Sequence, residues 1–256
     1  MFDKFKAVFN IKSVWLLAGV LVLGGLFVYS IFSISKQRCI VISITISNKE
    51  THPFLNEKNI LDLATNYQIE ILKGKLMKDI DLNEVEKRII KNKLIETCQV
   101  HAGTRNTLFI DVTLQEPVGR YSTNAGAGGY YVNRRGNTFQ LSNQFTDRVL
   151  ILSGKYFQGK QNVRDKKYED DVLHFINRIN EEGFWKAQIT QIDVDSLRNI
   201  KIVPLVGDHI VDFGRPIDVE EKLIKLKYFY KNILADNRYS QFKKVSVKFQ
   251  DQIVCE

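Results

Sequence analysis

The chain has 256 residues, of which 44% are hydrophobic and 26% are charged, and it contains 4 prolines. This composition is typical of globular proteins and argues against disordered, collagen-like and low-complexity architectures. The three cysteines, Cys39, Cys98 and Cys255, are too few for a disulfide scaffold and include no Cys-x-x-Cys pair. The formal net charge is +8, so the position of the basic residues decides whether a nucleic-acid partner is expected.

Half of this net charge lies beside one apolar segment. Val14 to Ile34 contains no charged residue over 21 positions, and at about 1.5 Å per helical residue it spans about 30 Å, the thickness of a bilayer core. Residues 1–38 hold five basic residues and one acidic residue, a net charge of +4 out of +8. The remaining residues carry no arginine-rich stripe, so nucleic-acid binding is not expected.

The apolar segment predicts a single transmembrane helix over Val14–Ile34. The apolar region of a signal peptide is shorter and ends in small residues, whereas bulky residues follow here. Basic residues flank the segment on both sides, so flanking charge alone leaves the orientation open. The short basic head, residues 1–13, slightly favours a cytoplasmic N-terminus with residues 39–256 across the membrane.

Residues 39–116 predict a compact unit in the order strand, helix, helix, strand, strand. Ile40–Ile46 is rich in β-branched residues and predicts the first strand. Asn56 can cap the first helix, and either Asp81 or Asn83 can cap the second. Two strands follow over Gln99–Ala102 and Thr107–Leu114, and the unit ends at Glu116-Pro117 because proline cannot continue a strand ladder.

Residues 117–256 predict a second module that is richer in strands. We expect a hairpin over Tyr130–Leu141, a strand over Asp147–Leu152, a helix with an apolar stripe from Tyr168 to Ile179, strands over Ile189–Val194 and Ile200–Phe213, a helix capped by Asp218, and a final strand over Lys244–Phe249.

The residues that could carry chemistry form no recognisable catalytic pattern. The four histidines, His52, His101, His174 and His209, lack metal-ligand spacing. The glycines of 126–129 lack the full pattern of a phosphate-binding loop and favour a flexible loop. Asp193 and Asp195 alternate on a predicted strand, which places both carboxylates on its polar face without any metal. The sequence therefore favours a binding protein without catalytic, cofactor-binding or metal sites over an enzyme.

The order of these elements resembles the FtsQ/DivIB family of bacterial cell-division proteins. Five stretches carry the resemblance: Thr107–Tyr121, Tyr131–Asn133, Gly136–Phe139, Leu150–Gly154, and Val211–Gly214 with the later Lys222-Leu223. The resemblance covers nearly the whole chain. Two positions depart from the family pattern, because Ile151 replaces a proline and Ser246 replaces an aspartate.

The resemblance implies an α+β chain with a cytoplasmic head (1–13), a transmembrane helix (14–34), a POTRA-like βααββ domain (39–116) and a β domain (117–256) that ends in an edge strand. It also implies a non-enzymatic divisome scaffold at the septum of the bacterial inner membrane. Such a scaffold binds the small bitopic proteins FtsB/DivIC and FtsL, which control septal peptidoglycan synthesis. Two other functions stay open: a POTRA-bearing export or assembly chaperone, and a membrane-anchored cell-wall enzyme.

We expect the main partner site on the final strand. An exposed edge leaves backbone groups to which a partner strand can add. The resemblance assigns Lys248 and Phe249 to a basic–aromatic pair at this contact, and lysines of the preceding helix could meet acidic partner residues. The predicted partner-binding residues are Lys225, Lys231, Val247, Lys248, Phe249, Gln250, Asp251 and Gln252.

Overall fold

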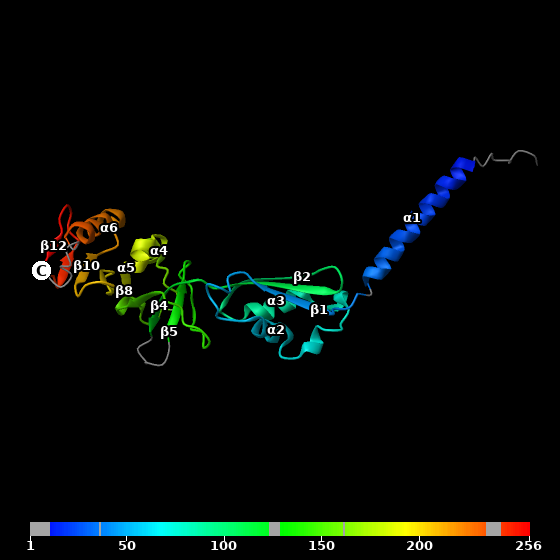
Figure 1. Cartoon of the computed structure of the whole chain (residues 1–256), viewed down its shortest axis with the longest axis horizontal. Helices are drawn as coiled ribbons and strands as arrows, with labels where there is room; N and C mark the ends of the chain where they lie inside the picture. Colours follow the sequence, from blue (N-terminus) through cyan, green and yellow to red (C-terminus); the bar gives the residue numbers. More distant parts are fainter. Residues whose placement is uncertain (1–10, 36, 123–128, 161, 234–241) are drawn as a thin grey trace, which may run out of the picture. The chain divides into compact units, whose positions relative to one another are not determined.

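The computed structural model describes residues 11–35, 37–122, 129–160, 162–233 and 242–256. These fall into two compact units, with residues up to 47, 56–92 and 97–112 in the first and residues 48–55, 93–96 and 113–256 in the second (Figure 1). The chain is α+β, as predicted. The predicted cytoplasmic head lies mostly outside the described residues, and so does the glycine-rich loop up to Gly128.

The predicted transmembrane segment forms helix α1, Ile11–Ser35. Within the part of the chain that the structure describes, no helix has both the length and the apolar character of a membrane span.

The first unit contains a three-stranded sheet and two helices. The strands are β1 (Val41–Ile46), β2 (Ile95–Ala102) and β3 (Thr107–Leu114), in the order β1-β3-β2 with β1 parallel to β3. The helices are α2 (Glu57–Thr65) and α3 (Leu82–Ile90), with the short 3₁₀ segments Ile69–Ile71 and Met77–Asp79 between them. This is the predicted βααββ order, although β2 begins four residues earlier than expected.

Side-chain caps fix the start of both helices. The side chain of Asn56 accepts from the backbone N–H of Asn59 at 2.9 Å, and the side chain of Asn59 accepts from the N–H of Asn56 at 3.0 Å. Asp81 accepts from the N–H of Glu84 at 3.0 Å, so Asp81 is the cap of α3. These reciprocal bonds satisfy N–H groups that have no partner within a helix.

The second unit is built on a nine-stranded sheet in the order β12-β11-β10-β9-β8-β7-β4-β5-β6. The strands are β4 (Pro117–Ser122), β5 (Gly129–Asn133), β6 (Thr138–Gln140), β7 (Leu150–Ser153), β8 (Ile189–Val194), β9 (Ile200–Pro204), β10 (Ile210–Gly214), β11 (Lys244–Ser246) and β12 (Val254–Cys255). The neighbours β4–β7, β7–β8 and β10–β11 are parallel, and the other neighbours are antiparallel.

Helices pack with one face of this sheet to form its core. The helices are α4 (Asp171–Glu181), α5 (Gly183–Gln188) and α6 (Val219–Tyr228), which continues as the π-helix Phe229–Ile233, and two 3₁₀ segments, Lys155–Phe157 and Lys166–Tyr168, precede α4. The sheet register aligns buried residues across five strands: Leu152, Ile192, Ile202, Val211 and Val245. Phe175 of α4 and Leu226 of α6 belong to the same core.

The final predicted strand differs from the expectation in length and position. It forms only over Lys244–Ser246, and β11 has β10 on one side and β12 on the other. The edge strand at this end of the sheet is therefore β12, a two-residue element that was not predicted because polar residues precede it. Strand β4 was also missed, since it starts at Pro117, where the sequence indicated a domain boundary; proline is tolerated as the first residue of a strand.

Candidate partner-binding site

The segment Val247–Ile253, which joins β11 to β12, holds six of the eight predicted partner-binding residues. Lys225 of α6 is hydrogen-bonded to this segment, because its Nζ donates to the carbonyl oxygen of Phe249 at 2.7 Å. The same Nζ lies 3.4 Å from Oε1 of Glu221. Lys225 therefore has a positioning role between α6 and the segment.

Val247 and Lys248 are held by Asp212 of β10. The backbone N–H of Val247 donates to the Asp212 carbonyl oxygen at 3.1 Å, and its side chain is fully buried. The Nζ of Lys248 donates to a carboxylate oxygen of Asp212 at 2.9 Å and lies 5.1 Å from the centre of the Phe249 ring. Val247 thus belongs to the core, while Lys248 orients the aromatic residue beside it.

The other predicted residues lie on the surface. Gln250, Asp251 and Gln252 are exposed in the turn before β12, and Asp251 has a positive φ of 55°. Lys231 is exposed on the π-helix that follows α6. The predicted partner-binding residue Phe249 is 44% exposed. A turn at this point breaks the strand period and turns the ring outward.

Two exposed apolar residues of α6 extend this surface. Ile224 is 68% exposed and Tyr228 is 60% exposed, and their i, i+4 spacing places them on one face of the helix. Neither residue was among the predicted partner-binding residues. Their signal was an apolar residue at positions where a solvated helix face is usually polar. We call β12, the segment Val247–Ile253 and this face of α6 the C-terminal surface.

In the part of the chain that the structure describes, no strand pairs with the outer side of β12. The N–H of Glu256 donates to the Lys244 carbonyl at 2.9 Å, and the N–H of Lys244 donates to the Glu256 carbonyl at 3.1 Å. These two residues therefore form a hydrogen-bonded pair, and the next pair, Val245 with Cys255, is a non-hydrogen-bonded one. The N–H and carbonyl of Cys255 consequently face away from β11.

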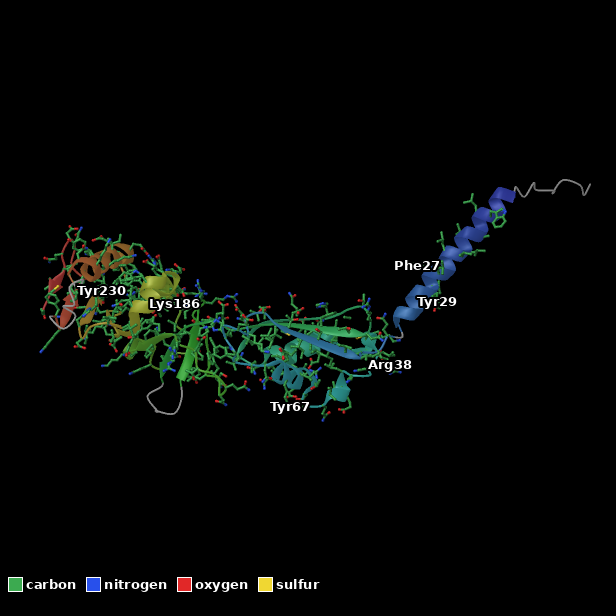
Figure 2. The ribbon with its side chains drawn as sticks, in the orientation of Figure 1. Phe27, Tyr29, Arg38, Tyr67, Lys186 and Tyr230 are labelled. Atoms are coloured by element: carbon green, nitrogen blue, oxygen red, sulfur yellow. The ribbon has the colours of Figure 1, made fainter. Side chains whose placement is uncertain are left out.

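A buried polar pair lies under the π-helix. The Nε2 of His209 lies 3.1 Å from the hydroxyl of Tyr230 (Tyr230 is labelled in Figure 2). Burial lowers the pKa of His209 and raises the pKa of Tyr230 to about 12, so both groups are neutral near pH 7. The Nδ1 of His209 has no hydrogen-bond partner among the described residues. An unsatisfied buried polar atom lowers the stability of the fold.

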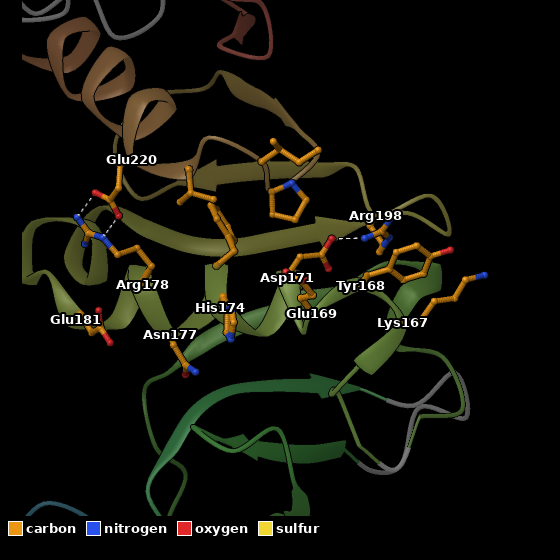
Figure 3. Close-up of a pocket in the computed structure, with 14 residues that line it drawn as sticks. Lys167, Tyr168, Glu169, Asp171, His174, Asn177, Arg178, Glu181, Arg198 and Glu220 are labelled. Carbon is orange, nitrogen blue, oxygen red and sulfur yellow. Dashed lines mark hydrogen bonds and ion pairs between the residues drawn. The ribbon is translucent and has the colours of Figure 1, made fainter.

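A cavity of about 860 Å³ lies between α4 and the residues that lead into α6, and Figure 3 shows its lining. Two arginines of its lining have partners within the protein, since Arg178 pairs with Glu220, and Arg198 pairs with Asp171 while stacking on the ring of Tyr168. These two guanidinium groups are therefore engaged by the protein's own carboxylates.

The acidic residues considered as metal ligands have structural partners. Asp193 accepts from the hydroxyl of Ser153 at 2.9 Å, and Asp195 accepts from the backbone and side chain of Asn199 at 2.8 and 2.9 Å. Across the residues that the structure describes, no group of three or more His, Cys, Asp or Glu side chains could hold a metal ion.

Comparisons with known families agree with this architecture. Residues 37–113 match the model of a POTRA-like domain, and residues 116–256 match the family described as FtsQ/DivIB, C-terminal related. No curated protein matches the chain. A POTRA-like unit followed by this β-rich unit defines a class of divisome proteins that generally act as scaffolds. The second match covers more than half of the chain, and the chain belongs to the FtsQ/DivIB family.

Proposed function

We propose that this chain is a non-enzymatic scaffold of the divisome that binds small bitopic division proteins of the FtsB/DivIC and FtsL kinds through its C-terminal surface. Through these partners it is linked to the control of septal peptidoglycan synthesis. Two observations support this role: β12 is an edge strand of the sheet, and the side chains of Ile224, Tyr228 and Phe249 are exposed. An edge strand offers backbone bonds, and apolar side chains beside it offer area to bury.

The described contacts and exposures divide the predicted residues into three groups. Lys225, Lys248 and Val247 bond to Phe249 and Asp212 of the same chain, so they position the site. Phe249, Gln250 and Gln252 are exposed and available to a partner. Lys231 and Asp251 add charge at the rim, where an exposed ion pair contributes about 0–1 kcal/mol.

A proline substitution tests backbone pairing only where it removes an N–H that a partner strand could use. Gln250 lies in a turn, so a proline there removes no ladder bond, whereas Cys255 presents its N–H to the open side. We expect Cys255→Pro to abolish co-purification with the FtsB/DivIC-type partner, because proline lacks the donor and is tolerated on edge strands. The matched control, Cys255→Ala, keeps the N–H and retains the partner. Equal partner recovery with both variants, each with an unchanged circular dichroism spectrum, contradicts the site.

Membrane attachment and septal location are further parts of the proposal. We propose that Val14–Ile34 anchors the chain in the inner membrane, with residues 1–13 cytoplasmic, the POTRA-like domain at 39–116 and the β domain at 117–256 both periplasmic. The uncharged run and the exposed apolar side chains of α1, such as Trp15 and Phe27, support an anchor. Protease added to spheroplasts should degrade residues 39–256, and depletion should give long cells without septa. A protected domain contradicts the orientation, and normal septa contradict the division role.

A further inference from the structure

The second unit has another cavity, of about 740 Å³, that the proposed partner site does not use. It lies where β7 and β8 begin, beside the end of α4 and beside α5. Its lining residues include Arg120, Arg148, Lys186, Ile151, Ile179 and Leu205. In the sheet order, β9, β10 and β11 separate this cavity from β12. We call it the basic cavity.

Three cations line the basic cavity without a counter-ion. Arg120, Arg148 and Lys186 have no side-chain hydrogen bond or ion pair within the described ranges of the chain. Of the three, Lys186 is the one labelled in Figure 2. Most other arginines of this unit are paired, among them Arg135 with Glu96 and Arg178 with Glu220. The lack of pairing at this cavity therefore leaves a concentrated positive field.

The single carboxylate among the described lining residues, Asp147, offsets one of these three positive charges. Asp147 lies 2.5 Å from Nδ1 of His52, and only 15% of its side chain is exposed. Its backbone N–H also donates to the hydroxyl of Tyr131 at 2.8 Å. Because Asp147 supplies one negative charge against three positive ones, a net positive charge remains at the cavity for a ligand to neutralise.

Apolar side chains lie next to the cations. Arg120 and Ile151 are register partners on the parallel strands β4 and β7, so their side chains project from the same face of the sheet. Ile151 and Leu205 are both exposed. A ligand that fits must therefore bring negative charge and an apolar group together, and a small anion alone would leave the apolar lining uncovered.

We propose that the basic cavity docks an acidic peptide segment of a partner protein, with at least one apolar side chain of that segment covering Ile151 and Leu205. Carboxylates of the segment pair with Arg120, Arg148 and Lys186. The cavity volume accommodates a few residues, since small-molecule sites of about 300–1,000 Å³ bury most of a drug-sized ligand. This contact is separate from the C-terminal surface.

The test uses the full chain, purified in a non-ionic detergent, and a fluorescein-labelled eight-residue peptide of alternating glutamate and leucine. Fluorescence anisotropy should show binding that weakens with added salt, because exposed charge pairs are screened. A peptide with glutamine in place of glutamate should bind at least about tenfold more weakly, since tenfold corresponds to about 1.4 kcal/mol and each ion pair contributes up to about 1 kcal/mol.

Variants with matched charge localise the binding. The triple variant Arg120→Gln, Arg148→Gln and Lys186→Gln should weaken binding at least about tenfold. The control triple variant, Lys155→Gln, Lys166→Gln and Lys201→Gln, removes the same charge at exposed positions outside the cavity and should retain binding. If the first triple variant misfolds by circular dichroism, the pair Arg148→Gln and Lys186→Gln replaces it, because both residues are exposed. Cys255→Pro should leave peptide binding unchanged.

Three outcomes overturn the proposal. One is equal binding of the glutamate and glutamine peptides, and another is an equal loss with both triple variants. The third is binding to phosphatidylglycerol vesicles that the cavity triple variant abolishes, in the absence of peptide binding, because this assigns the cavity to lipid headgroups.

Discussion

The Nζ of Lys225 and the carbonyl oxygen of Phe249 are 2.7 Å apart, and this hydrogen bond connects α6 to the segment Val247–Ile253. A charged donor makes such a bond stronger than a neutral one. We expect Lys225→Met, which keeps the aliphatic stem, to lower the free energy of unfolding by about 1 kcal/mol and to weaken partner binding. Chemical denaturation and co-purification measure the two effects.

The control for this variant is Lys231→Met, at an exposed lysine of the adjoining π-helix. It removes the same charge without removing the bond to Phe249, so its free energy of unfolding should stay within about 0.5 kcal/mol of the wild type. Identical stability for both variants would show that the Lys225 bond does not position the segment.

Ile224 provides a test of the exposed face of α6. We expect Ile224→Asp to leave the unfolding free energy within about 0.5 kcal/mol of the wild type, since the side chain is exposed. Partner affinity should fall at least about tenfold, because a charge is placed at the centre of an apolar contact. Leu197→Asp is the matched control, at a residue that is 63% exposed and outside the C-terminal surface. Similar affinities for the two variants argue against a contact at α6.

His209 should make stability depend on pH. Its folded-state pKa is lowered by burial, so it lies below the unfolded-state value of about 6.5. Above about pH 6.5 the histidine is neutral in both states; as pH falls below this value the unfolded chain takes up the proton first, and the free energy of unfolding decreases until the folded pKa is reached. The fall in Tm between about pH 7.5 and pH 5 should therefore be smaller in His209→Gln than in the wild type.

His101→Gln serves as the comparison, because the side chain of His101 is 57% exposed. This variant should keep the wild-type fall in Tm over the same pH range. A fall in Tm that is unchanged in His209→Gln would assign the pH dependence to other groups.

The role of the POTRA-like unit needs a deletion that spares the second unit. Asn48–Leu55 belongs to the second unit, where the buried Phe54 ring lies 5.5 Å from Tyr131. Deleting 39–116 would remove this core residue. We therefore expect replacement of residues 57–91 by a short glycine–serine linker to abolish septal fluorescence of a labelled chain while partner co-purification persists. If septal fluorescence is retained, the POTRA-like unit does not direct localisation and acts only as a spacer.

Local patterns predicted most of the first unit because its signals lie close together in sequence. Asn56 and Asp81 are caps whose partners lie three residues away, and Thr107–Leu114 alternates over a full strand. The sequence could not predict the position of β11 inside the sheet, since this depends on two residues of β12 that carry no strand signal. The sequence also did not predict that Phe54 belongs to the second unit, because this depends on the packing of its ring against Tyr131 and Phe139.

The basic cavity could not be predicted from the sequence either, because its residues are distant from one another in the chain. Arg120 and Lys186 are 66 positions apart in the chain, and only the folding of β4, β7 and α5 brings them to one cavity. Their lack of counter-ions is likewise a property of the folded surface, because each has acidic residues within a few positions in sequence, such as Glu116 and Glu182.

The short ladder of β12 also affects the kinetics of partner exchange. Two residues pair with β11 in this strand, and local unfolding of so few bonds costs far less than global unfolding. In the free protein, amide hydrogens of β12 should therefore exchange with solvent rapidly while those of buried β10 are retained. A bound partner strand would hold β12 from its second side, so the terminal strand and its partner would become ordered together and be released together.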